Sequence, residues 1–221
     1  MATTMTEYAR EREAMVERQL KRRGITEKLI LDAFLEVPRE CFVSPEYAHL
    51  AYGDHPLPIE ANQTISQPYV VALMIQAAGI GLRDKVLEVG AGSGYAAAVI
   101  SRIAGKVIGI ERQHDLVRIA GERMRRLGFD NVDIVEGDGT KGWAECAPYD
   151  AILAAASGSH VPQALLDQLS PGGKIVMPIG SPGWAQELVK VTKRADGTVT
   201  QENLGGVRFV PLIGEEGWKN A

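Results

Sequence analysis

The sequence has 221 residues, 45% of them hydrophobic, which is enough for one globular domain with a sizeable core. Its formal net charge of -4 argues against a general nucleic-acid-binding surface, because such a surface usually needs an excess of basic residues. The two cysteines, Cys41 and Cys146, offer neither a disulfide framework nor metal-ligand spacing, and no run of about 18 apolar residues predicts a membrane span. We therefore expect a soluble cytoplasmic protein without a metal site.

The N-terminal part of the chain predicts two helices and a long loop. Apolar residues at helical spacing indicate a helix over 7–23, which Gly24 ends, and a second helix that Thr26 caps and Pro38 terminates. Five prolines then occur between Pro38 and Pro68 in an aperiodic stretch that still contains large apolar side chains. We expect this loop to be ordered and functional, not a linker.

From residue 70 onward, helical and strand patterns alternate. Helices are predicted over 70–78, 96–103, 116–127 and 162–169, and strands over 86–89, 106–110, 132–135, 151–154, 174–177, 187–192 and 207–210. This alternation indicates an α/β fold, a doubly wound and mostly parallel Rossmann-like sheet with N-terminal helices and late antiparallel strands. We expect a single domain over 1–221, with a helical and loop region over about 1–68, a ligand-binding core over 69–180 and C-terminal strands over 181–221.

The sequence VLEVGAGSGY over 86–95 joins a buried strand to the next helix through a glycine-rich turn. Glycines allow a backbone to approach a bound molecule closely. A dinucleotide fingerprint would require Gly or Ala at position 95, where this chain has Tyr95. Glu88 precedes the first glycine by two residues, and burying its carboxylate is unfavourable without a hydrogen bond or a positive charge.

This spacing resembles motif I of class I S-adenosylmethionine-dependent methyltransferases, in which the acid faces the cationic methionine end of the cofactor. An ordinary strand-to-helix turn with a solvated Glu88 is the alternative. Two more acids follow the next strands: Glu111, placed to accept hydrogen bonds from ribose hydroxyls, and Asp138, placed to read an adenine edge. Each alone is more often a solvated loop residue, but three acids at three successive strand ends predict an adenosine-bearing ligand.

Four further segments narrow the resemblance. They are TISQPYVVALM over 64–74, GDGTKGWAECAPYDAI over 137–152, LLDQLSPGG over 165–173 and VRFVPL over 207–212. Together with the glycine-rich turn, they resemble protein-L-isoaspartate (D-aspartate) O-methyltransferases over nearly the whole chain. One departure is Glu60 and Ala61, where the family is expected to have Gly or His before the Gln-Thr pair, and this leaves the detailed fit of the peptide open.

The resemblance implies methyl transfer from S-adenosylmethionine to the free α-carboxylate of L-isoaspartyl residues in damaged proteins and peptides, with D-aspartyl residues left open as acceptors. The ester proceeds to a succinimide, whose hydrolysis returns some normal aspartate, so the activity is protein repair. Because a carboxylate is already ionised at neutral pH, it needs no general base, and we expect alignment and desolvation to provide the rate.

The resemblance also assigns site residues. It places the active-site hydroxyl at Ser66, which would orient the substrate carboxylate; capping of the helix that begins near Gln67 is an alternative role for this serine, and both can coexist. Cofactor contacts are implied for Ile65, Gln67, Glu88, Gly90, Gly92, Ser93, Glu111, Asp138 and Gly139. Substrate contacts are implied for Ser66, Arg208 and Val210.

Two other functions stay open on the sequence. A methyltransferase for a small molecule or RNA would keep the glycine-rich turn but leaves the TISQP and GDGTKGW segments unexplained. A non-catalytic binding module would be free to lose the acids and Ser66 that this chain has. We expect isoaspartyl-containing proteins and peptides as partners of a monomer that binds neither nucleic acid nor membrane.

Overall fold

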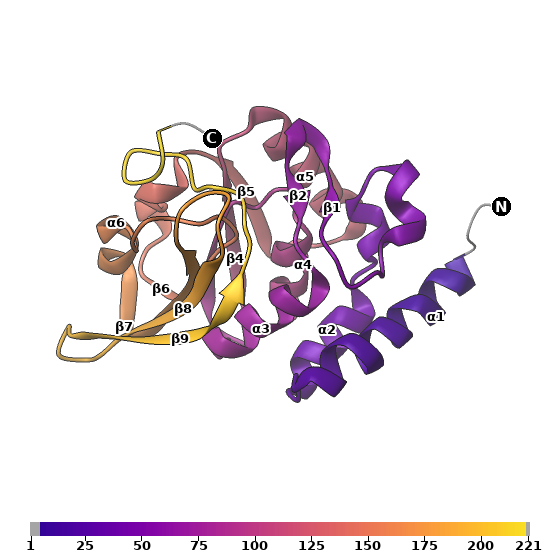
Figure 1. Cartoon of the computed structure of the whole chain (residues 1–221), viewed down its shortest axis with the longest axis horizontal. Helices are drawn as coiled ribbons and strands as arrows, with labels where there is room; N and C mark the ends of the chain where they lie inside the picture. Colours follow the sequence, from indigo (N-terminus) through magenta and orange to yellow (C-terminus); the bar gives the residue numbers. More distant parts are fainter. Residues whose placement is uncertain (1–4, 220–221) are drawn as a thin grey trace.

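A computed structural model describes residues 5–219 and is built around a seven-stranded sheet (Figure 1). The strand order is β5-β4-β3-β6-β7-β8-β9. Strands β5 to β7 in this order are parallel, and β8 and β9 extend one edge in antiparallel pairing. The predicted α/β fold with late antiparallel strands is therefore confirmed.

The elements follow the predicted alternation. The helices are α1 (Met5–Met15), α2 (Lys28–Glu36), α3 (Pro68–Ala78), α4 (Tyr95–Ser101), α5 (His114–Leu127) and α6 (Gln163–Asp167). The strands are β1 (Leu57–Pro58), β2 (Thr64–Ile65), β3 (Lys85–Val89), β4 (Lys106–Glu111), β5 (Val132–Glu136), β6 (Tyr149–Ala154), β7 (Leu169–Ile179), β8 (Gln186–Lys193) and β9 (Val199–Val207). Helices α1 and α2 lie at one end of the molecule and the β8–β9 hairpin at the other (Figure 1).

The sheet has a hydrophobic cluster on each face, because successive side chains of a strand point in opposite directions. In β3, Val86 packs with α3, α4 and the N-terminal helices, whereas Leu87 and Val89 pack on the face that α6 covers. Glu88 belongs to the same side of the strand as Val86. The strand therefore carries this carboxylate into the interior beside the glycine-rich turn.

Three expectations need correction. The second helix begins at Lys28 with Glu27 at its N-cap, while the backbone N–H of Thr26 donates to the side chain of Gln76. The helix predicted over 162–169 is shorter, because β7 already begins at Leu169. The strand predicted over 207–210 is wrong: β9 ends at Val207. Beyond it, the side chain of Gln186 holds Phe209, and a single parallel bridge pairs Pro211 with Ser157.

The loop between Pro38 and Pro68 is ordered, as predicted. It contains short 3₁₀ turns and the two-residue strands β1 and β2, which pair as a small hairpin. No helix among residues 5–219 is long and apolar enough to cross a membrane.

Candidate active site

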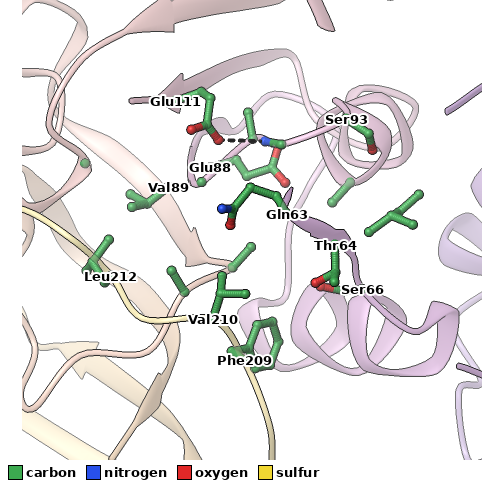
Figure 2. A pocket seen from close by; sticks show the side chains of 18 of the residues that line it. Gln63, Thr64, Ser66, Glu88, Val89, Ser93, Glu111, Phe209, Val210 and Leu212 are labelled. Carbon is green, nitrogen blue, oxygen red and sulfur yellow. Dashed lines mark hydrogen bonds between the residues drawn. The ribbon is translucent and has the colours of Figure 1, made fainter. Parts of the chain in front are cut away.

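A cavity of about 370 Å³ lies at the carboxyl ends of the central strands, and its size suits a small organic ligand. We call its three sides the floor (residues 88–93, 110–113 and 139), the roof (the β1–β2 hairpin and Ser66, residues 57–66) and the tail (residues 209–213). Figure 2 shows Glu88, Glu111 and Ser93 at one end of the cavity, and Thr64, Ser66 and Phe209 at the other. Gln63 reaches from the roof into the space between them.

The glycine-rich turn makes the floor accessible. Gly90, Gly92 and Gly94 have φ values of 84°, 53° and 86°, which side chains rarely adopt. The backbone N–H groups of Gly90 and Ala91 donate to the carbonyl of Ile110 at 2.9 and 3.1 Å, so the turn is anchored on β4. A ligand can therefore approach the backbone closely without displacing the turn.

Glu88 is a buried carboxyl group of the floor whose hydrogen bonding is incomplete. Its side chain is 2% exposed, and its Oε2 atom has no hydrogen-bond partner among the described residues. Burial and the neighbouring carboxylate of Glu111 raise the pKa of Glu88 to about 8, although a hydrogen bond from the backbone of Ala97 opposes this shift. A cationic group in the cavity would supply the missing partner and favour the ionised form.

Glu111 has a different environment, although it is also buried. Its Oε2 accepts the backbone N–H of Gly92 at 3.0 Å, and its Oε1 accepts those of Arg112 and Gln113 at 2.8 and 2.9 Å. A carboxylate has about four acceptor positions, and three are used here. One acceptor position on Oε2 remains for a hydroxyl group of a ligand.

Ser66 lies in the roof, directly before α3. The helix has Gln67 at its N-cap and no side-chain capping hydrogen bond, so the structure does not use the Ser66 hydroxyl as a cap. That hydroxyl makes no hydrogen bond within residues 5–219 and borders the cavity. The buried Arg39 donates from Nη2 to the carbonyl oxygen of Ser66 at 2.8 Å and from Nε to that of Ala51 at 2.7 Å, which fixes the serine backbone.

Most of the predicted site residues meet at this cavity. Its lining includes Ile65, Ser66, Glu88, Gly90, Gly92, Ser93, Glu111, Gly139 and Val210. Sequence reasoning missed several other lining residues, among them Asn62, Gln63, Arg112, Gln113 and Phe209. Arg112 and Gln113 directly follow the predicted Glu111, and this adjacency is the signal that would have found them.

Three predicted side chains lie outside the lining. Gln67 donates its amide to the carboxylate of Asp54 at 2.8 Å, and Arg208 is exposed. Asp138 accepts hydrogen bonds from Thr140 and from the backbone N–H of Glu215 at 2.8 Å. Burial acts to raise the pKa of Asp138, but these hydrogen bonds hold it below its ordinary value.

The described residues contain no group of three or more His, Cys, Asp or Glu side chains placed to hold a metal ion. What the cavity offers is a buried carboxylate with a free oxygen at one end, a free hydroxyl at the other, and apolar tail residues alongside. This arrangement can bind a cationic, hydroxyl-bearing ligand next to an anionic group while excluding water.

Sequence comparison places the chain among known proteins. A family model described as protein-L-isoaspartate(D-aspartate) O-methyltransferase matches residues 10–217. Protein-L-isoaspartate O-methyltransferase 2 of Pelobacter propionicus is 51% identical over 207 residues, which cover 94% of this chain and 92% of that protein. A protein-L-isoaspartate O-methyltransferase of Rhodopseudomonas palustris is 50% identical over 205 residues, covering 93% of this chain and 94% of the relative.

Solved structures agree with the sequence comparison. One described as a protein-L-isoaspartate O-methyltransferase has a TM-score of 0.85 and 33% identity, with 93% of this chain and 66% of that chain covered. A putative enzyme of this kind from Plasmodium falciparum, solved in complex with S-adenosyl-L-homocysteine, has a TM-score of 0.78 and 29% identity, with 90% and 97% covered. The likeness extends well beyond the glycine-rich turn that many methyltransferases have.

Proposed function

The chain belongs to the protein-L-isoaspartate(D-aspartate) O-methyltransferase family, and on that premise we propose how the residues of its cavity carry out the reaction. The enzyme transfers a methyl group from S-adenosylmethionine to the free α-carboxylate of an isoaspartyl residue in a damaged protein, and the ester proceeds to a succinimide. The family match over 10–217 includes the TISQP and GDGTKGW segments. The alternative hypothesis, a methyltransferase for a small molecule or RNA, does not explain these segments.

The observation that carries the assignment of the cofactor end is the free Oε2 atom of the buried Glu88. S-adenosylmethionine supplies the methyl group on a sulfonium cation and carries an ammonium group nearby. Glu88 supplies a negative charge for this cationic end, and Gly90, Gly92 and Ser93 let the backbone lie against it. Glu111, which has one acceptor position left, accepts a hydrogen bond from a ribose hydroxyl of the cofactor.

At the other end of the cavity, Ser66 orients the substrate. Its free hydroxyl donates to one oxygen of the isoaspartyl carboxylate, which leaves the other oxygen directed at the methyl group. Phe209 and Val210 in the tail exclude water from both charges, and the loss of charge in the transition state favours such a dry environment. No side chain has to remove a proton, because the carboxylate is already ionised.

The family match and the net charge indicate which partners the enzyme has. The enzyme acts on isoaspartyl-containing proteins. We propose that it does so as a monomer that binds neither nucleic acid nor membrane; the net charge of -4 supports the absence of nucleic-acid binding. Arg208 is proposed to contact the substrate outside the cavity, where its exposed side chain can reach a peptide.

The decisive experiment compares transfer of labelled methyl to an isoaspartyl peptide with transfer to the same peptide containing normal aspartate. Base-labile label on the isoaspartyl peptide alone is expected.

Ser66→Ala should lower kcat by about tenfold to a hundredfold, as expected for losing a hydrogen bond to a charged group, with the Kd of S-adenosylmethionine nearly unchanged. Thr64→Val is the matched control, because Thr64 is the neighbouring roof hydroxyl. A loss of turnover in Thr64→Val alone would transfer the role to Thr64.

A further inference from the structure

The tip of the roof, residues 59–63, has an unusual backbone. Ala61 has φ 54° and ψ 30°, and Asn62 has φ 56°, so two successive non-glycine residues adopt left-handed conformations. The backbone N–H of Gln63 donates to the carbonyl of Glu60 at 3.2 Å and that of Ile59 to the carbonyl of Gln63 at 2.9 Å, which closes a two-residue hairpin turn of the kind that has positive φ at both central residues. The hairpin pairs only two residues per strand, so contacts with the rest of the fold must determine where the tip lies.

Those contacts come from α5 and from the floor. Glu60 Oε1 lies 3.0 Å from Arg123 Nη2, and the side chains are 32% and 8% exposed, so the ion pair is largely shielded from water. Arg123 also donates from Nη1 to the carbonyl oxygen of Ser93 at 3.4 Å. One guanidinium thus connects the roof, through Glu60, to the glycine-rich turn, through Ser93.

Packing reinforces this connection. The side chain of Ile59 lies over the turn, since a Cβ atom added at Gly92 would be 3.4 Å from Ile59 Cδ1. Asn62, Gln63 and Thr64, on the other side of the tip, border the cavity, and Gln63 points into it (Figure 2). The tip therefore covers the floor residues to which we assign the cofactor.

We infer that Glu60 and Arg123 are positioning residues that latch the roof over the bound cofactor and set how fast it exchanges. The inference rests on the proposed placement of the cofactor on the floor. Exchange requires the tip to move away from Ser93 and Gly92, and that movement breaks the Glu60–Arg123 ion pair. This gives a role to Glu60, which stands where the sequence departs from the family pattern. Neither residue borders the cavity, so neither takes part in the methyl-transfer step.

The test follows dissociation of labelled S-adenosylhomocysteine from the enzyme after a chase with unlabelled ligand. Glu60→Gln should raise the dissociation rate about tenfold, the size expected for a shielded charged hydrogen bond, while the single-turnover rate with saturating ligands stays within about twofold. Arg123→Gln should raise the dissociation rate at least as much, because it also loses the hydrogen bond to the carbonyl of Ser93. The double variant should dissociate only slightly faster than Arg123→Gln, because both changes break the same ion pair. Glu122→Gln is the matched control: it removes an exposed ion pair with Arg118 on the same helix and should leave the rate unchanged.

Hydrogen exchange in the ligand-free protein gives a second measurement. The backbone N–H groups of Ile59 and Gln63 are hydrogen-bonded within the tip, and their exchange should accelerate in Glu60→Gln but not in Glu122→Gln. Unchanged dissociation and exchange in a folded Glu60→Gln protein would overturn the latch. A wild-type enzyme that binds S-adenosylhomocysteine but methylates no isoaspartyl peptide would refute the proposed function while the dissociation experiment still decides on the latch.

Discussion

The floor of the cavity is formed by the ends of the sheet strands and the turns that follow them, whereas side chains from distant parts of the chain help to hold the roof and the tail. In the floor, Glu111 accepts hydrogen bonds from the two residues that follow it and from Gly92. In the roof, Arg39 fixes Ser66 across 27 positions, and in the tail Gln186 fixes Phe209 across 23. The floor is thus part of the sheet, while the roof and tail are attached to it.

This difference separates two kinds of mutational effect. A change in the floor disturbs strands that belong to the hydrophobic core, so it should alter cofactor binding and folding together. A change at one of the attachments should leave the sheet intact and alter cofactor exchange or peptide binding. Substitutions at Glu88, Gly139 and Gln186 test this separation.

The largest effect is expected at Glu88, the charge of the floor. Glu88→Gln removes the negative charge opposite the cationic end of S-adenosylmethionine and should weaken cofactor binding about a hundredfold, as expected for a buried charged interaction. Isothermal titration calorimetry measures the Kd. The glutamine has nearly the same size, so a wild-type Kd would show that the buried carboxylate is not the cationic subsite.

The same variant has a defined pH dependence. The pKa of Glu88 is raised to about 8, so between its ordinary value and 8 the folded protein holds a proton that the unfolded chain has lost. The contribution of Glu88 to the stability of the ligand-free protein is therefore complete at low pH and is lost as the pH rises through 8. The Tm of Glu88→Gln should equal that of the wild type near about pH 5 and exceed it near about pH 9. Cofactor binding by the wild type should strengthen over the same range, because a cation binds the ionised form.

Gly139 tests the packing of the floor. A Cβ atom at this position would lie 2.5 Å from Cγ1 of Val89, a buried and stiff residue at the end of β3. Gly139→Ala should therefore lower the free energy of unfolding by about 1–3 kcal/mol and weaken cofactor binding together with it. Denaturant unfolding measures the first effect. The control is Gly206→Ala in β9, where no atom lies within 4 Å of an added Cβ; equal losses in both variants would contradict the packing argument.

The sequence predicted the floor because its determinants are local. Strands β3 and β4 begin and end within a residue or two of the predicted ranges, and the glycine spacing places Glu88 and Glu111 at the cavity. Hydrophobic periodicity and turn chemistry need only neighbouring residues, so they can be recognised in one sequence.

The attachments of the roof and tail could not be predicted in this way. The segment 207–210 has apolar residues suitable for a strand, but the side chain of Gln186 hydrogen-bonds to the backbone N–H and carbonyl of Phe209. No residue close to Phe209 in the sequence indicates this contact. Asp138 has the predicted type and position, yet its carboxylate binds the backbone of Glu215, 77 residues away. A fully buried Arg39 looks like a surface arginine in the sequence. Long-range side-chain contacts of this kind require the fold.

Substitution of Gln186 should have the smallest effect on stability and the clearest effect on the KM for the peptide substrate. Its amide accepts the N–H of Phe209 at 2.7 Å and donates to the carbonyl of the same residue at 3.1 Å. Gln186→Met keeps the volume but loses both hydrogen bonds, and because Phe209 is half-buried, water can replace part of them, so the stability loss should be about 1 kcal/mol.

A loosened tail should raise the KM for the isoaspartyl peptide severalfold and leave the Kd of the cofactor unchanged, because Phe209 lies at the Ser66 end of the cavity (Figure 2). Gln168→Met is the matched control, since Gln168 holds a different segment in the same way, by accepting the N–H of Trp143 and donating to the carbonyl of Lys141. Similar stability losses with a raised KM in Gln186→Met alone would show that the tail is an attachment with its own function. A raised KM in both variants would mean that the peptide responds to general loosening, and the distinction between floor and tail would fail.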